Sequence, residues 1–274
     1  MNDYLKKIKQ LIADSEAILI GAGAGLSTAA GFEYGGATFL KHFSYMHKKY
    51  GYTDMYSAGF HNFSSPEEMW GYWSKFIYLN RYQGVKPLYV ALYELFKDKN
   101  YFVLTTNVDH QFQLAGFDKN RLFYTQGDYG LFQCSLPCHK STYDNIDIIK
   151  KMISSLDEDY KIPSTLIPTC PICGRQMSMN LRSDDTFVED EGWHKGATRY
   201  VNFLKENEDK KLLLIELGVG FNTPGIIKYP FWQILSENKN AYLISINKGE
   251  AYVPRKIKQR VYLIDEDIKK IFMD

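Results

Sequence analysis

Four cysteines supply the clearest metal chemistry in the sequence. Cys134 and Cys138 form one closely spaced pair, and Cys170 and Cys173 form a second pair in a Cys-Pro-Ile-Cys-Gly segment. Two such pairs can bring four thiolates to one tetrahedral ion, the usual arrangement of a structural zinc site. In a reducing compartment, clustered cysteines bind metal more often than they form disulfides. We therefore predict one closed structural zinc site. The alternatives are that His139 replaces one of the cysteines as a ligand, and that the reduced thiols cluster by chance.

A glycine-rich segment follows the first apolar run of the chain. Residues 21–27 read Gly-Ala-Gly-Ala-Gly-Leu-Ser. Glycines allow a sharp turn and a close approach to a ligand. A helix that starts near Ser27 would point its free N–H groups at a bound anion. The segment predicts a phosphate or pyrophosphate site, although its spacing matches neither the usual dinucleotide fingerprint nor the P-loop. The alternative is a tight turn that binds nothing.

Three later apolar runs also end in glycine or short polar residues. The residues concerned are Thr106, Asn107 and Asp109 after 101–105, Gly218, Val219 and Asn222 after 212–217, and Asn247 after 241–246. In open α/β sheets, ligands bind outside the carboxyl ends of the strands. Four such loops together therefore predict one ligand site. The simpler interpretation of Asn107 and Asp109 is capping of a helix N-terminus.

The elements that must position these residues alternate along the chain. Continuous apolar runs, which suit strands buried on both faces, occupy 17–20, 101–105, 212–215, 241–246 and 261–264. Apolar stripes at helical spacing lie between them. They comprise Leu5, Ile8, Ile12 and Ala13 in one helix and Leu88, Leu92, Leu95 and Phe96 in another. Ser65, Pro66 and Glu68 indicate a helix start, with Ser65 as cap and Glu68 reaching back. This alternation predicts a doubly wound, Rossmann-like parallel sheet.

Two insertions interrupt the predicted sheet. The core would consist of residues 1–32, 85–126 and 196–274, in one domain spanning 1–274. Residues 33–84 read as a helical, aromatic-rich insertion, and residues 127–195 as a small zinc-binding module. The rings of residues 39–82 are expected to be core, because burial of each large ring is worth a few kcal/mol, about 2–3.

Composition narrows the class of protein. The chain has 33 basic and 32 acidic side chains, a net charge of +1, with 45% apolar residues. These values fit a globular protein and give no general electrostatic attraction to nucleic acid or to a membrane. The sequence has no apolar stretch long enough for a transmembrane helix and no signal-peptide pattern at its start. We therefore expect a cytoplasmic protein.

Together these residues resemble the sirtuin family of NAD-dependent enzymes. Residues 23–32 are similar to the family's Gly-Ala-Gly-Ile-Ser opening and its following glycine, and residues 105–109 look like its Thr-Gln-Asn-Ile-Asp motif. Residues 218–224 take the place of its Gly-Thr-Ser loop, and residues 246–247 match its Ile-Asn pair. The cysteine pairs fall where the family has its zinc module. The resemblance spans the whole chain in the right order; the first two motifs are specific and the third is loose.

The resemblance implies a role for each of these residues. NAD would bind between the Rossmann-like domain and the zinc module. Asn107 would hold the nicotinamide ribose and position a nucleophile, Asp109 would bind the carboxamide, and Gly218 and Asn247 would contact the adenosine half. The cofactor-binding set that it implies is Ala22, Gly23, Ala24, Gly25, Ser27, Thr106, Asn107, Asp109, Gly218, Val219, Asn222 and Asn247.

The sequence departs from the family at the parts used for deacylation. The family's catalytic histidine precedes a glycine, and here Gln126 precedes Gly127. A histidine can remove a proton from a ribose hydroxyl, whereas a glutamine amide can only orient a ribose or water. The family's Asp-Phe-Arg is replaced by Glu-Tyr-Gly-Gly at 33–36, and its Val-Val-x-Phe-Gly-Glu segment is not evident near 184–193.

This combination resembles a bacterial, macrodomain-linked sirtuin branch (class M) that transfers ADP-ribose to protein. The resemblance implies a lipoylated carrier protein of the glycine-cleavage type as acceptor, a macrodomain hydrolase acting on the product, and Asn107, Asp109 and Gln126 as catalytic residues. Two other functions stay open: a weak deacylase that uses Gln126 or His110 as a displaced base, and an NAD-sensing or NAD-hydrolysing module. The aromatic insertion has a functional alternative too, as a pocket for the nicotinamide ring or for an acyl or lipoyl chain.

Overall fold

The computed structural model describes residues 3–273, which form two units. The first unit comprises the chain up to Gly31, Val85–Gly127 and the chain from Glu189 onward, and the second comprises Phe32–Gly84 and Asp128–Val188. No helix among residues 3–273 has both the length and the apolar character needed to cross a membrane.

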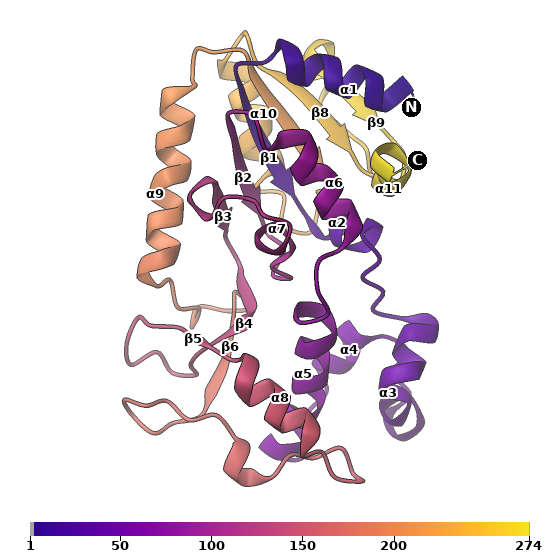
Figure 1. The fold of residues 1–274 in the computed structure, drawn as a ribbon, viewed down its shortest axis with the longest axis vertical. Coiled ribbons are helices and arrows are strands. Elements are labelled where there is room, and N and C mark those ends of the chain that lie inside the picture. The colour runs from indigo at the N-terminus through magenta and orange to yellow at the C-terminus, as the bar shows by residue number, and fades with distance from the viewer. Residues whose placement is uncertain (1–2, 274) are drawn as a thin grey trace. The chain divides into compact units, whose positions relative to one another are not determined.

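A six-stranded parallel sheet forms the centre of the first unit (Figure 1). Its order is β3-β2-β1-β7-β8-β9. The strands are β1 (Ala17–Ala22), β2 (Tyr101–Thr105), β3 (Leu122–Tyr124), β7 (Leu212–Leu217), β8 (Tyr242–Ile246) and β9 (Val261–Ile264). Every residue of β1, β2 and β7 is buried, because helices cover both faces of the sheet. The predicted doubly wound sheet is confirmed, and the strand order reverses direction between β1 and β7, where such folds bind ligands.

Helices pack on both faces of this sheet. One apolar cluster contains residues of α1 (Asp3–Asp14), α2 (Ala24–Ala29), α6 (Pro87–Phe96), α7 (Gln111–Leu114) and α11 (Ile268–Met273), and the other contains residues of α9 (Glu191–Glu206) and α10 (Lys228–Glu237). Figure 1 shows α1, α6 and α11 together on one side of the sheet, opposite α9. The predicted stripe on α6 lies in the first cluster through Leu88, Leu92 and Phe96.

The boundary between β1 and α2 differs from the prediction. Gly21 belongs to the strand, and a Cβ atom there would lie 2.4 Å from Ile227 Cγ2 and 2.8 Å from Phe231 Cζ. Gly21 therefore allows close packing against α10, not a turn. The helix begins at Ala24 instead of near Ser27, with Gly23 as its extended N-cap residue.

The second unit combines helices with a three-stranded sheet. The helices are α3 (Gly36–Tyr50), α4 (Met55–Gly59), α5 (Pro66–Arg81) and α8 (Ile146–Ser154), and the strands β4 (Gly127–Cys134), β5 (Tyr143–Asp144) and β6 (Met177–Leu181) lie in the order β5-β4-β6. Phe39, Phe43, Tyr72 and Phe76 are buried in one cluster of this unit, so these rings are core, as expected.

The start of α5 follows the sequence prediction in part. The Ser65 side chain accepts a hydrogen bond from the Glu68 N–H, and Pro66 is the first residue of the helix. The Glu68 carboxylate reaches back one residue further than a capping box requires, because it accepts the N–H and hydroxyl of Ser64.

A buried ion pair joins α10 to the sheet of the first unit. Lys228 Nζ donates to Glu216 Oε2 at 2.8 Å, and the two side chains are 0% and 1% exposed. The Ser245 hydroxyl donates to the same oxygen at 2.8 Å, whereas Glu216 Oε1 is buried without a partner among the residues described. Burial raises the pKa of Glu216, and the Lys228 ammonium opposes that rise. Each charge therefore depends on the other to remain inside the protein.

Removal of one member of this pair should destabilise the fold more than removal of both. Lys228→Met should lower the free energy of unfolding by about 3–5 kcal/mol, because it leaves a buried carboxylate without its cation. The double variant Lys228→Met, Glu216→Gln should recover a large part of that loss. Urea denaturation measures both, with Lys239→Met, at an exposed lysine, as the control. A cost below about 1 kcal/mol for Lys228→Met would contradict the interpretation.

Candidate active site and metal centre

Three glycines hold two loops of the first unit in backbone contact. The Gly25 N–H donates to the Gly218 carbonyl at 3.0 Å, and the Gly23 N–H donates to the Leu217 carbonyl at 3.1 Å. A Cβ atom on Gly23 would lie 2.7 Å from the Gly218 oxygen, and one on Gly25 would lie 2.8 Å from the Gly218 Cα. Side chains at these positions would force the loops after β1 and β7 apart.

Gly218 is the most restricted of the three. Its φ of +62° lies in the left-handed region, and a Cβ atom there would lie 2.3 Å from the Leu26 nitrogen and 2.4 Å from the Gly25 carbonyl carbon. The glycines are therefore required by packing between loops. This requirement accounts for their presence without a ligand, and it also fixes the start of α2 against the end of β7.

A buried polar network ties the loop after β2 to the same place. The Ser27 hydroxyl donates to Asp109 Oδ2 at 2.6 Å, and the Tyr89 hydroxyl lies 3.4 Å from the same oxygen. Asn107 Nδ2 donates to the Gly23 carbonyl at 3.0 Å and to the Tyr89 hydroxyl at 3.3 Å. Asn107 and Asp109 are 9% and 4% exposed, so this network is largely shielded from water.

Tyr89 is the member of the network that the sequence did not reveal. It lies on α6 between Leu88 and Leu92, where its ring packs with the apolar stripe and its hydroxyl meets Asn107 and Asp109. Complete burial raises the pKa of Tyr89 well above its ordinary value, so the hydroxyl stays protonated and can donate. A tyrosine beside the predicted apolar stripe was the available signal, because a buried hydroxyl needs a partner.

The structure brings most of the predicted site residues together. The Thr106 N–H donates to the Ala22 carbonyl at 3.1 Å, and Asn247 Nδ2 donates to the Val219 carbonyl at 3.3 Å. The loops after β1, β2, β7 and β8 are thus joined by hydrogen bonds at the carboxyl ends of the strands. Ala24 is exposed at the start of α2. Asn222 is exposed on the loop after β7, and no hydrogen bond within residues 3–273 ties it to the network.

Gln126 occupies the turn that follows β3. The preceding residue is fixed to β2, because the Thr125 N–H donates to the Thr105 carbonyl at 2.9 Å. Gly127 has a φ of +92°, which lets the chain reverse there. The Gln126 side chain is half-buried and makes no hydrogen bond to the residues described, so its amide is available to a ligand.

The capping interpretation of Asp109 is partly correct. Asp109 Oδ1 accepts the N–H of Gln111, the first residue of α7, at 3.0 Å, while Oδ2 belongs to the network. Asn107 donates through its Nδ2 atom and caps no helix. One carboxylate therefore shapes the helix and also closes the network.

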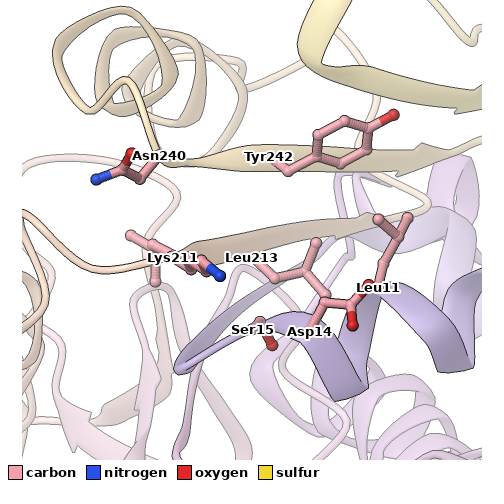
Figure 2. Close-up of a pocket in the computed structure, with 8 residues that line it drawn as sticks. Leu11, Asp14, Ser15, Lys211, Leu213, Asn240 and Tyr242 are labelled. Carbon is pink, nitrogen blue, oxygen red and sulfur yellow. The ribbon is translucent and has the colours of Figure 1, made fainter.

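A hollow of the first unit lies at the amino ends of the strands, away from the four joined loops (Figure 2). It has a volume of about 230 Å³ and is lined in part by Ser15, Lys211 and Asn240, which stand just before β1, β7 and β8. Open α/β sheets bind ligands at the carboxyl ends of their strands, so this hollow is not the candidate active site.

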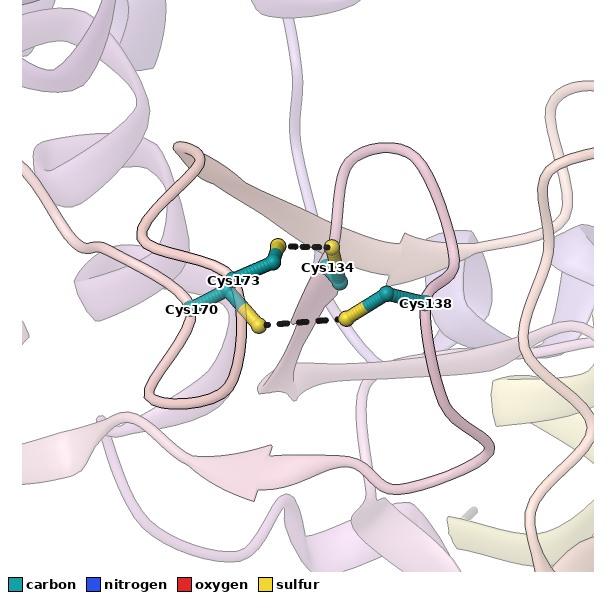
Figure 3. A group of neighbouring side chains, drawn as sticks. All are labelled: Cys134, Cys138, Cys170 and Cys173. Carbon is teal, nitrogen blue, oxygen red and sulfur yellow. Dashed lines mark hydrogen bonds between the residues drawn. The ribbon is translucent and has the colours of Figure 1, made fainter.

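Four thiols of the second unit form a compact cluster (Figure 3). The sulfur atoms of Cys134, Cys138, Cys170 and Cys173 all lie within 4.8 Å of one another, with Cys134 to Cys173 at 3.6 Å and Cys138 to Cys170 at 3.7 Å. Four sulfurs at about 2.3 Å from a tetrahedral ion would be about 3.8 Å apart, so the geometry suits a structural metal. The Arg175 backbone N–H lowers the pKa of the Cys173 thiol, whereas burial raises the pKa of the Cys138 thiol, so the four thiols do not lose their protons equally easily.

His139 lies beside this cluster. Its Nδ1 atom is 3.0 Å from Cys138 Sγ and 3.9 Å from Cys170 Sγ, and its Nε2 atom is 2.9 Å from the Tyr143 hydroxyl. The four thiols already complete a tetrahedral set. His139 is therefore placed to orient a ligand thiol, not to replace one.

Comparison with known proteins connects these features to a family. No protein-family model matches the chain. A protein of Staphylococcus aureus strain Mu50 named "Protein ADP-ribosyltransferase" is 38% identical over 266 residues, which cover 96% of this chain and 84% of that protein. A protein of Fusarium oxysporum named "Probable bifunctional ADP-ribose hydrolase/ADP-ribosyltransferase" is 30% identical over 91% of this chain, which spans 43% of the fungal protein.

Solved structures show the same fold. A structure described as "Sir2 bound to acetylated peptide" has a TM-score of 0.61 at 18% identity, covering 98% of this chain and 95% of that one. Another, "Sir2-p53 peptide-NAD+", has a TM-score of 0.59 at 21% identity with the same coverage.

The fold, the interlocked loops and the thiol cluster define a sirtuin-type, NAD-dependent transferase. The chain belongs to the sirtuin family, which confirms the resemblance seen in its motifs. The staphylococcal relative and the sirtuin fold support NAD-dependent ADP-ribosylation as its chemistry.

Two glycines with a left-handed φ, Gly218 and Gly249, allow a matched test of how tightly the loops after β1 and β7 pack. Gly218→Ala should lower the free energy of unfolding by about 3 kcal/mol or more, because backbone strain adds to a clash with α2. Gly249→Ala should cost about 1 kcal/mol, since Gly249 has a φ of +79° but nothing within 4 Å of an added Cβ. Thermal and urea denaturation measure the difference. Equal costs for the two variants would show that the loop contact is not tight.

Proposed function

We propose that the protein is an NAD-dependent protein ADP-ribosyltransferase of the sirtuin type. The observation that carries this proposal is the combination of a buried Asn107–Asp109 network with Gln126 at the position of the family's base. Asn107 and Asp109 can hold and orient a ligand, because both are fixed by hydrogen bonds. Gln126 can orient a hydroxyl or a water, but it cannot remove a proton.

NAD, when bound, supplies the ADP-ribosyl group and nicotinamide as the leaving group. The residues that would hold it are those of the four joined loops, with Ala22, Gly23 and Ser27 toward the diphosphate and Gly218 and Asn247 toward the adenosine. Asn107 uses Nδ2 for the Gly23 carbonyl and the Tyr89 hydroxyl, which leaves its amide oxygen to accept a hydroxyl of the nicotinamide ribose. The work of the site is positioning, which can lower a barrier substantially without a general base.

Deacylation is the second candidate, since the family's solved structures include one bound to an acetylated peptide. It would require a base acting on a ribose hydroxyl, and His110 is the histidine nearest in sequence to Asp109. His110 lines a small pocket together with Trp193 and Arg199. Gln126, and not a histidine, stands at the position of the family's base, and this favours transfer over deacylation.

A protein acceptor is supported by the peptide complexes among the sirtuin structures. We propose a lipoylated carrier protein of the glycine-cleavage type as that acceptor, on the resemblance to the macrodomain-linked branch. A macrodomain hydrolase that removes the modification is the proposed partner enzyme. The fungal relative supports this pairing, because its name joins an ADP-ribose hydrolase to an ADP-ribosyltransferase in one protein.

We further propose that the metal of the thiol cluster is zinc. The purified protein should contain one zinc per chain, measured by metal analysis. Cys170→Ala should lose the metal and destabilise the second unit, because the binding energy of a structural zinc is folding energy. Lys150→Ala, at an exposed residue of α8, is the control. Less than half an equivalent of zinc in carefully purified wild type would contradict the assignment.

The proposed function predicts a specific order of effects on one preparation. With NAD and a lipoylated carrier protein, intact-mass spectrometry should show the added mass of ADP-ribose on the carrier. Asn107→Ala should abolish transfer, Asp109→Ala should reduce it by about 10²-fold or more, and Gln126→Ala should weaken it, because each loss removes positioning. Asn202→Ala, at an exposed residue of α9, should behave as wild type.

The same preparation separates the rival functions. Deacetylation of an acetyl-lysine peptide would yield O-acyl-ADP-ribose, and NAD hydrolysis would yield free ADP-ribose alone. Rapid deacetylation by the wild type without any protein ADP-ribosylation would overturn the transferase proposal.

A further inference from the structure

The first unit contains a small pocket that takes no part in the proposed reaction. It lies beside β3 and the start of α9 and has a volume of about 170 Å³. Its lining residues are His110, Gln113, Lys119, Leu122, Phe123, Tyr124, Gly192, Trp193, Gly196 and Arg199. Gly196 helps to shape it, since a Cβ atom there would lie 2.9 Å from the Phe123 ring.

The charges that line this pocket are of one sign. Lys119 and Arg199 are the charged residues of the lining, both basic, and no aspartate or glutamate is among the ten lining residues. The whole chain carries a net charge of only +1, so this is a local surplus. Acidic residues close by in the sequence have other partners: Asp190 accepts the Trp193 N–H at 2.8 Å, and Asp118 lies 4.0 Å from Arg121.

Arg199 is a basic lining residue with a buried, unsatisfied donor. Its one hydrogen bond runs from Nη2 to the Lys119 carbonyl at 3.5 Å. Its Nε atom is buried without a partner, and no carboxylate within residues 3–273 forms an ion pair with it. A guanidinium in a partly buried position gains most from an oxyanion, which can accept two parallel hydrogen bonds.

The pocket adjoins two of the three proposed catalytic residues. His110 directly follows Asp109, and its φ of +63° is unusual for a residue other than glycine, so the surrounding structure must hold it in place. Trp193 Nε1 donates to the Thr125 carbonyl at 3.1 Å, directly before Gln126. A group bound in this pocket would therefore touch the residue that follows Asp109 and the tryptophan that is hydrogen-bonded to the carbonyl before Gln126.

We propose that this pocket binds a side-chain carboxylate on an acidic segment of the protein acceptor; this proposal rests on the proposed function. Drug-sized ligand pockets have volumes of roughly 300–1,000 Å³, so this pocket is too small for a whole dinucleotide but large enough for one acidic side chain. The Phe123 and Trp193 rings suit the aliphatic part of such a side chain, and Arg199 suits its oxygens. The contact would orient the acceptor beside Asp109 and Gln126.

Two short peptides test this site without NAD and without turnover. One carries three consecutive aspartates and the other carries three asparagines in the same frame. Calorimetry at low salt should show the aspartate peptide binding wild type at least about tenfold more tightly than the asparagine peptide, because a charge-assisted hydrogen bond is lost in the second. Arg199→Gln should remove about tenfold of that affinity, and Arg199→Lys should restore part of it. Lys195→Gln, which removes an exposed charge from the same helix, should bind as wild type.

Further measurements separate this site from its rivals. NAD affinity and melting temperature should be unchanged in Arg199→Gln. If that variant does not fold, Lys119→Gln should still weaken the aspartate peptide about threefold, since Lys119 is exposed. Equal binding of the two peptides, an equal loss of NAD affinity, or tight binding of inorganic phosphate without the peptide would each overturn the proposal. If wild type prefers the aspartate peptide but transfers no ADP-ribose to a protein acceptor, the result would instead count against the proposed function.

Discussion

The candidate active site depends on one backbone contact, between the loop after β1 and the loop after β7. Gly23 and Gly25 meet Gly218 so closely that a Cβ atom on any of them would collide with main-chain atoms. Main chain cannot move aside as a flexible side chain can. The start of α2, the end of β7 and the polar residues tied to them are therefore held as one rigid group. The glycines that suggest a phosphate site in the sequence serve this contact first, and a ligand site is its consequence.

The polar network built on that contact holds groups still and does not move protons. Asp109 shares its two oxygens among Ser27, Tyr89 and the Gln111 N–H, and Asn107 is held by a carbonyl and a phenol. Complete burial keeps the Tyr89 hydroxyl protonated. A site of this kind favours reactions in which bond cleavage follows from orientation. Gln126, in the turn after β3, is consistent with such a site because its amide can orient a ligand. The Gln126 amide cannot act as a general base.

Sequence patterns predicted the sheet and most loop residues because both follow from local rules. Continuous apolar runs can be buried on both faces, and loops at the carboxyl ends of parallel strands must meet. Tyr89 could not be predicted, because its role depends on a partner on another element and its ring fits the stripe of α6. Lys228 and Glu216 were missed for a related reason, since their ion pair forms only when the helix and the strand are brought together. The start of α2 was misplaced because Gly23, and not a polar side chain, is its N-cap residue.

The segment after β2 shows how one short stretch can serve two neighbouring sites. Asp109 belongs to the buried network. The next residue, His110, has a left-handed conformation and lines the pocket of Arg199 and Trp193. A residue with a Cβ atom adopts that conformation only where its surroundings over-determine it. The strain is acceptable here because the chain must change direction within one residue. Two adjacent side chains can then address different partners, the carboxylate of Asp109 with neutral hydrogen-bond donors and the imidazole of His110 with the basic residues of the pocket. The close spacing of the two sites is thus a property of the backbone itself, independent of which acceptor the protein uses.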